Sequence, residues 1–131
     1  MTSQDSDRIA IAELVASYGD AVSRRDAGAW GATWAADATW SLMGHEVTGR
    51  EAIVALWLGA MAQFEAVSFL TELGPIRLDG DRAATRSQTQ EVLRTTEGTI
   101  RRVAGIYEDE FVRIDSRWYF ARRVFAILIE H

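Results

Sequence analysis

The sequence predicts an α+β domain in which three N-terminal helices lie against a strongly curved, mostly antiparallel sheet. Apolar residues at helical spacing, and residues that cap helices, lie almost entirely in the first half of the 131-residue chain. From about residue 66 onward, strand-like segments follow one another, separated by the turn signals DGD, TEG and DSR. Helices segregated from a run of strands are typical of the α+β class. The length fits one domain over residues 1–131.

The first helix is expected over residues 5–25, with Asp5 or Ser6 as its N-cap. One apolar stripe at helical spacing consists of Ile11, Leu14, Val15, Tyr18 and Val22. Asp26 then has the spacing of an N-cap for a second, short helix in AGAWGATW. Asp20 is expected to face solvent or Arg24, which lies four residues further on.

A third helix is expected over residues 49–64, after a short strand in ATWSLM and a turn at GHE. Thr48 and Glu51 of TGRE have the spacing of a capping box, in which each side chain accepts from a backbone N–H. Four strands are expected after this helix. They are AVSFLTELGPIRL, RAATRSQTQEVLR, TIRRVAGIYEDEFVRI and RWYFARRVFAILIE.

The composition argues against several functional classes. A net charge of −5 disfavours nucleic acid as a partner, since binding to phosphates relies on clustered Lys and Arg. The sequence contains no cysteine and no apolar run near the ~18 residues that a membrane span needs. Its N-terminus lacks the apolar core of a secretory signal, so a cytoplasmic protein without membrane contact is expected. The two histidines, His45 and His131, are isolated, and no metal site is predicted.

A sheet bent around an amphipathic helix leaves an apolar pocket between the two, lined by side chains that alternate inward. The five tryptophans can supply core and pocket wall together. The segments VAGIY and FAILIEH carry apolar side chains on both faces. We therefore expect a second subunit to cover the outer face of the sheet, giving a homodimer.

Several local patterns, in this order, resemble the SnoaL-like branch of the nuclear transport factor 2-like superfamily. They are ELVASYGDAVSRRDAGAWGATWAADATW, VTGREAI, IRLDGDRAATRS and GIYEDEFVRIDSRWYFARR, which together span roughly residues 9–123. The resemblance implies a cone-shaped α+β barrel. It also implies an interior pocket for a hydrophobic small molecule and chemistry that needs no cofactor, as in polyketide cyclases and scytalone dehydratase-like enzymes.

The catalytic positions of that branch are only partly kept. Tyr18, Asp20 and Asp26 match its Y-x-D-x-x-D-x-x-D pattern, but Ser23 replaces the middle aspartate. Where the dehydratases carry a histidine, this chain has Ser68 or Phe69. Arg123 stands where the cyclases carry an aspartate in the last strand. The usual acid–base pair is therefore absent.

Two residues remain as candidates for catalysis. Tyr18 can donate a hydrogen bond to a ligand oxygen, or serve only as an amphipathic core residue. Alternation in IYEDEF places Tyr107 and Asp109 on one face. If that face is inward, Asp109 can transfer a proton; the alternative is an ion pair with Arg122 or Arg86.

Other polar residues leave several roles open. Glu91 lies in the polar segment RSQTQEVLR, which fits an outer face, a dimer interface or a pocket wall. His45 is expected in an exposed turn, or in a lid over the pocket.

Two functions therefore stay open. The first is a cofactor-free enzyme that isomerises, dehydrates or cyclises a hydrophobic small molecule by proton transfer, with Tyr18 and Asp109 as catalytic residues. The second is a non-catalytic ligand-binding or accessory module. The expected ligand-binding residues are Ser23, Trp34, Trp40, Trp57, Phe69, Tyr107 and Trp118.

Overall fold

The computed structural model describes residues 2–131. Its elements, in chain order, are α1 (Ser3–Arg24), α2 (Ala27–Gly31), β1 (Trp34–Leu42), β2 (His45–Thr48), α3 (Arg50–Met61), β3 (Phe64–Glu72), β4 (Ile76–Asp79), β5 (Arg82–Thr95), β6 (Ile100–Ile114) and β7 (Arg117–Glu130). None of the helices in this described part of the chain has the length and apolar character that a bilayer crossing requires.

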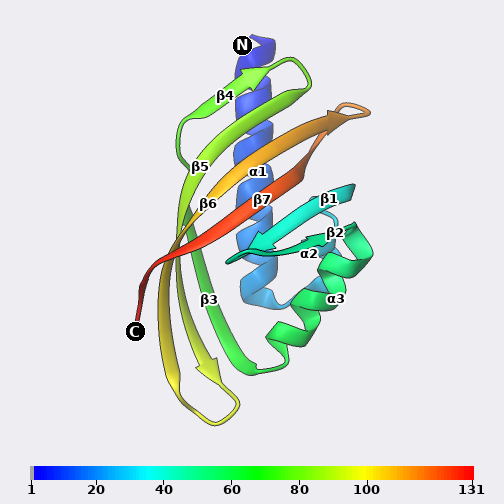
Figure 1. Cartoon of the computed structure of the whole chain (residues 1–131). Coiled ribbons are helices and arrows are strands. Elements are labelled where there is room, and N and C mark those ends of the chain that lie inside the picture. The colour runs from blue at the N-terminus through cyan, green and yellow to red at the C-terminus, as the bar shows by residue number, and fades with distance from the viewer. Residues whose placement is uncertain (1) are drawn as a thin grey trace.

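The seven strands of the described residues form one strongly curved sheet, with α1 lying along its concave face (Figure 1). The strand order is β2-β1-β7-β6-β5-β3, and β4 pairs with β5. Every neighbouring pair is antiparallel except β1 and β7, which are parallel. The predicted fold class, with helices against a curved and mostly antiparallel sheet, is confirmed.

The helix starts are only partly as predicted. Asp26 caps α2 as expected, accepting from the Ala29 N–H at 3.0 Å. The N-cap of α1 is Thr2, and Asp5 is its capping-box partner, so the assignment of the cap to Asp5 or Ser6 is wrong. The Thr48–Glu51 capping box is also wrong, because Gly49 is the N-cap of α3 and has no side-chain bond. Thr48 instead ends β2 and lies opposite Thr39 of β1.

The predicted strand AVSFLTELGPIRL is in fact two strands, β3 and β4, separated around Pro75. Proline cannot donate to a strand ladder, which explains the break. Gly74 lies so close to β5 that a Cβ there would be 1.9 Å from the Arg86 carbonyl oxygen. The segment after Met43–Gly44 is a strand as well, because His45–Thr48 folds back on β1.

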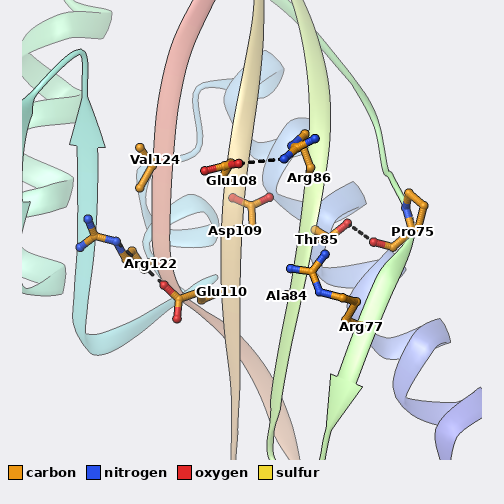
Figure 2. A pocket seen from close by; sticks show the side chains of 10 residues that line it. All are labelled: Pro75, Arg77, Ala84, Thr85, Arg86, Glu108, Asp109, Glu110, Arg122 and Val124. Carbon is orange, nitrogen blue, oxygen red and sulfur yellow. Dashed lines mark hydrogen bonds and ion pairs between the residues drawn. The ribbon is translucent and has the colours of Figure 1, made fainter.

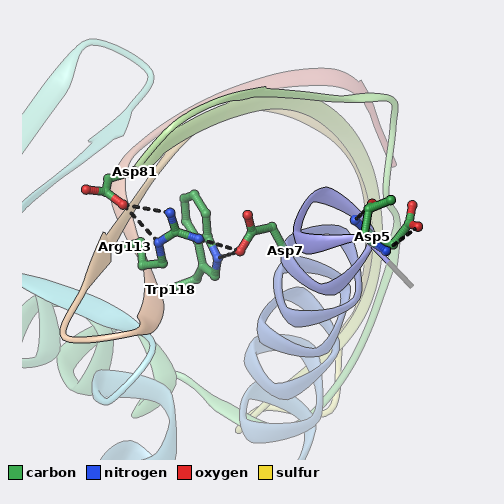
Figure 3. Close-up of polar contacts among 6 residues, drawn as sticks. Asp5, Asp7, Asp81, Arg113 and Trp118 are labelled. Atoms are coloured by element: carbon green, nitrogen blue, oxygen red, sulfur yellow. Dashed lines mark hydrogen bonds and ion pairs between the residues drawn. The ribbon is translucent and has the colours of Figure 1, made fainter.

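The N-terminal end of α1 is bonded to the hairpin between β6 and β7 (Figure 3). The Asp7 carboxylate accepts from Arg113 at 2.6 Å and from the indole N–H of Trp118 at 3.1 Å. Arg113 also reaches Asp81, at 2.8 Å. These bonds raise the pKa of Arg113, with Asp81 as the largest cause and Asp7 next. A single carboxylate thus ties the first helix to the last hairpin.

Candidate functional site

A buried ion pair occupies the concave face of the sheet. Asp109 of β6 and Arg123 of β7 are direct cross-strand partners. The Arg123 Nε lies 2.6 Å from Asp109 Oδ1, and a second guanidinium nitrogen lies 3.1 Å from Oδ2. Ser87 of β5 donates to Oδ2 as well, at 3.0 Å. The side chains of Arg123 and Asp109 are 1% and 0% exposed. Asp109 therefore faces inward and shares this face with Tyr107, as the alternation predicted for the pair.

The partner of Asp109 is neither of the two arginines expected from the sequence. Arg86 pairs with Glu108 on the outer face, and Arg122 pairs there with Glu46. A register shift between β6 and β7 leaves Ala121 without a partner. Such a bulge reverses which side chains face inward. Trp118 and Phe120 face the interior before the shift, and Arg123 and Phe125 face it afterwards.

Aromatic rings surround the Arg123 guanidinium. Its carbon lies 3.7 Å from the ring centroid of Tyr107, 4.3 Å from Phe120 and 4.4 Å from Tyr18. Burial is the largest single influence and disfavours the charged guanidinium, but Asp109, Tyr18 and Tyr107 together outweigh it and raise the pKa of Arg123. A buried ion pair costs desolvation free energy that a hydrophobic pair would avoid. Its presence in the interior therefore points to a role beyond stability.

Two phenols lie beside this ion pair. Burial raises the pKa of Tyr18 above its usual value of 10, although the Arg123 charge lowers it in part. Burial likewise raises the pKa of Tyr107 well above 10. The Tyr107 hydroxyl accepts from the indole N–H of Trp40 at 3.2 Å. Both phenols are neutral at physiological pH and can donate a hydrogen bond.

The structure brings most of the expected ligand-binding residues into one aromatic cluster. The Tyr18 ring lies 6.1 Å from Trp34 and 5.8 Å from Phe69, centroid to centroid. Trp34 packs 5.9 Å from Trp40. Trp57 joins through Trp30, on which it stacks at 4.6 Å. Trp30 was not among the residues expected at the site, although its four-residue spacing from Trp34 was a signal.

Ser23 and Trp118 lie outside this cluster of packed rings, and their assignment as ligand-binding residues stays a prediction. Ser23 is exposed on α1, where its hydroxyl accepts from the Phe69 backbone N–H at 3.2 Å. Trp118 bonds to Asp7 and borders a separate groove of about 510 Å³ between α1, α2 and the β6–β7 hairpin. At the histidine position of the resemblance, Phe69 is buried and Ser68 is exposed.

Three buried polar atoms in the interior have no hydrogen-bond partner among the described residues. They are the indole nitrogens of Trp30 and Trp34 and the hydroxyl of Thr89. Buried donors without a partner are uncommon and call for an explanation. Trp30, Trp34 and Thr89 are each at most 1% exposed, so these groups lie inside the packed interior.

Glu91 is a second carboxylate on the concave face. Ser87, Thr89, Glu91 and Leu93 alternate inward along β5, and this regular alternation in the sequence was the signal for them. Burial raises the pKa of Glu91 to about 7, although nearby Arg101 lowers it in part. The charge of Glu91 in turn raises the pKa of Tyr18. Glu91 was left open as part of an outer face, a dimer interface or a pocket wall. Its inward position fits the pocket wall.

The outer face of the sheet is different in character. A groove of about 580 Å³ lies over β4, β5, β6 and β7 (Figure 2). Charged side chains line most of it, and they pair with one another, as Arg86 does with Glu108 at 3.1 Å. His45 lies away from it, exposed at the start of β2. Within residues 2–131, no three His, Asp, Glu or Cys side chains gather as a possible metal site.

Solved structures share this fold. A candidate scytalone dehydratase from Novosphingobium aromaticivorans DSM 12444 is 22% identical, with a TM-score of 0.90 over 98% of this chain and 88% of that one. The hexachlorocyclohexane dehydrochlorinase LinA-type3 from Novosphingobium barchaimii LL02 is 19% identical, with a TM-score of 0.86 over 98% and 90%. The Kfla4162 protein from Kribbella flavida is 18% identical, with a TM-score of 0.90 over 98% and 95%.

At these identities the likeness shows the fold alone. None of the curated proteins matches the sequence significantly. The model of the SnoaL-like domain family matches residues 4–124, which is nearly the whole chain. The chain therefore belongs to the SnoaL-like branch of the nuclear transport factor 2-like superfamily.

Proposed function

We propose that the protein is a cofactor-free enzyme that isomerises, dehydrates or cyclises a hydrophobic small molecule by proton transfer. The observation that carries this proposal is the concave face of the sheet. Neutral phenols, a buried ion pair and a further carboxylate lie together there, within an aromatic lining. The names of two structural neighbours, a dehydratase and a dehydrochlorinase, describe the loss of water and of hydrogen chloride, and they agree with this reaction class.

Tyr18 polarises the substrate in this proposal. Its phenol keeps its proton at physiological pH, because burial raises its pKa. A neutral phenol in an apolar surrounding stabilises the oxyanion of an enolate by donating a hydrogen bond. The positive charge of Arg123, 4.4 Å from the Tyr18 ring, strengthens the phenol as a donor.

Asp109 takes a positioning role rather than the proton-transfer role first considered. Both of its carboxylate oxygens accept hydrogen bonds, from Arg123 and from Ser87. A general base needs a free lone pair within reach of the substrate proton. Asp109 instead holds Arg123 against the rings of Tyr18 and Tyr107.

The exchange of the α-hydrogens of 2-tetralone in D₂O, followed by ¹H NMR, tests this function. The compound is a fused bicyclic ketone with acidic C–H bonds. We expect the wild-type protein to accelerate the exchange and Tyr18→Phe to slow it by about 10²-fold. Tyr119→Phe is the matched control, since Tyr119 is half-buried and lies beside Arg117, away from the cluster. Equal rates for Tyr18→Phe and wild type would remove Tyr18 from the mechanism.

A binding protein without catalysis is the second candidate. Ser23 favours this second candidate. It replaces the middle aspartate of the family pattern, and its hydroxyl accepts a hydrogen bond from the Phe69 backbone N–H. In that case 2-tetralone quenches the tryptophan fluorescence but its hydrogens do not exchange faster than in buffer. The two readouts on one compound separate an enzyme from a binding module.

We also propose a homodimer formed through the outer face of the sheet. Leu70, Val92 and Ile129 are 67%, 41% and 70% exposed there. The arginine and glutamate side chains of the charged groove on the same face can pair with those of a second copy, because that groove carries both charges. Sedimentation at micromolar concentration should give twice the mass of the chain, and Ile129→Asp should shift it to the monomer. A monomeric wild-type protein would refute the dimer.

A further inference from the structure

Glu91 is a carboxylate on the inner face of the sheet that keeps part of its surface accessible. It is half-buried on the concave face, whereas Asp109 on the same face is fully buried. Its cross-strand partners are Phe69 of β3 and Val103 of β6. The Phe69 ring in turn lies 5.8 Å from the Tyr18 ring. Phe69 therefore links Glu91 to the phenol that the proposed function uses.

The Glu91 carboxylate makes no ion pair or hydrogen bond with any residue between 2 and 131. The charged groups that face it are few. Arg101 of β6 is the cation whose charge acts on Glu91, but it bonds to Glu130 of β7 at 3.4 Å. Tyr18 of α1 is the titratable group that senses the Glu91 charge. Glu91 thus keeps its lone pairs free, which Asp109 does not.

A second unpartnered group lies beside it. The Thr89 hydroxyl is 1% exposed, points to the same face two residues earlier in β5, and has no partner among the described residues. Thr89 lies opposite Gly105, which has no side chain to bond to it. Two adjacent inward groups, one acidic and one hydroxylic, thus have no hydrogen-bond partner among the described residues.

We infer that Glu91 is the group that carries the proton in the reaction proposed above, on which this inference rests. In this inference a flat hydrophobic ketone binds beside Phe69, which is the cross-strand partner of Glu91 and packs on Tyr18. The Glu91 carboxylate takes a proton from the carbon next to the carbonyl. The C–H electron pair forms the C=C bond of an enolate, and the carbonyl π electrons move to the oxygen, which accepts from Tyr18. The carboxylic acid then returns its proton to carbon.

The electrostatics of Glu91 suit this role. Burial raises its pKa to about 7, so both protonation states are populated at physiological pH. A general base whose pKa lies near the working pH can both accept and return a proton. This raised pKa also makes folding depend on pH. The free energy of unfolding falls as the pH rises from the unfolded-state pKa, near 4.5, through 7, because the native state holds the proton more tightly.

The first test compares exchange rates of 2-tetralone in D₂O. Glu91→Gln should slow the exchange by at least about 10²-fold. The wild-type rate should rise with pH about a midpoint near 7. Glu97→Gln is the control, because Glu97 is exposed in the turn between β5 and β6. An active wild type with an equally active Glu91→Gln overturns the role of Glu91 alone. A wild type that exchanges no faster than buffer overturns the proposed function itself.

The second test needs no activity. In protein labelled with ¹³C at the glutamate carboxyl carbon, the resonance that disappears in Glu91→Gln should titrate near pH 7 and move when 2-tetralone is added. Urea unfolding should show Glu91→Gln gaining stability over wild type between pH 5 and pH 8. A wild-type spectrum in which no glutamate resonance titrates near pH 7, or in which the one that does is unmoved by 2-tetralone, would overturn the assignment even if the variant fails to fold.

Discussion

Replacing Asp109 with asparagine lowers the free energy of unfolding by about 3–5 kcal/mol. The substitution keeps the size of the side chain but leaves the Arg123 guanidinium as a fully buried charge with no countercharge. Removing one partner of such a pair is costly, because the remaining buried ion has lost its hydration and no longer has an opposite charge to offset that loss. Urea unfolding followed by tryptophan fluorescence measures the change.

Two further variants make the test specific. Glu108→Gln alters the neighbouring residue of β6, which is 65% exposed and pairs with Arg86. We expect it to cost no more than about 1 kcal/mol. The double variant Asp109→Leu with Arg123→Met removes both charges and should recover most of the loss. A double variant as unstable as Asp109→Asn would show that packing, rather than the unpaired charge, sets the cost.

Trp30→Ala is expected to cost about 3–5 kcal/mol as well. Trp30 is fully buried, stacks on Trp57 at 4.6 Å and meets Trp40 edge-on at 5.3 Å. Its removal opens a cavity that these large neighbours cannot fill without moving. Near-UV circular dichroism should lose intensity in the same variant, because coupled indole rings dominate that spectrum.

Leu58→Ala on α3 is the control for the tryptophan. Leu58 is 50% exposed, so its truncation removes little buried surface. We expect its urea midpoint to stay close to that of the wild type. A Trp30→Ala protein as stable as Leu58→Ala would mean that the aromatic cluster repacks, and that its rings do not hold a fixed site.

The sequence was sufficient for the class of fold because its signals are local. Helical spacing, the Asp26 cap and the alternation along β5 and β6 each depend on neighbouring residues. The missed helix start at Gly49 shows where local reasoning fails. A threonine such as Thr48 can cap a helix or end a strand. Here Thr48 ends β2, because it pairs with Thr39 of β1. That pairing is a tertiary contact that the motif TGRE does not contain.

The candidate site was only half predictable for a similar reason. Tyr18, Tyr107 and Asp109 follow from regular periodicity, and the structure places them together inside the sheet. The inward position of Arg123 does not follow from periodicity, because the bulge at Ala121 shifts the alternation of β7 by one residue. A bulge depends on how two strands match in register, and nothing in RWYFARRVF marks it. Reasoning without it offered Arg122 or Arg86 as the partner of Asp109, and both lie on the opposite face.

The Asp7 contact that joins α1 to the last hairpin has a consequence for how the chain folds during synthesis. Asp7 bonds to Arg113 across 106 positions of sequence, and β1 pairs with β7 across a similar span. A ribosome releases the first helix long before either partner exists. The apolar stripe of α1 can pack on Trp34 and Phe69 earlier, but the N-terminal end at Asp7 has no partner until the final hairpin emerges. Contacts of such long range also slow folding of the finished chain, since loop closure precedes their benefit.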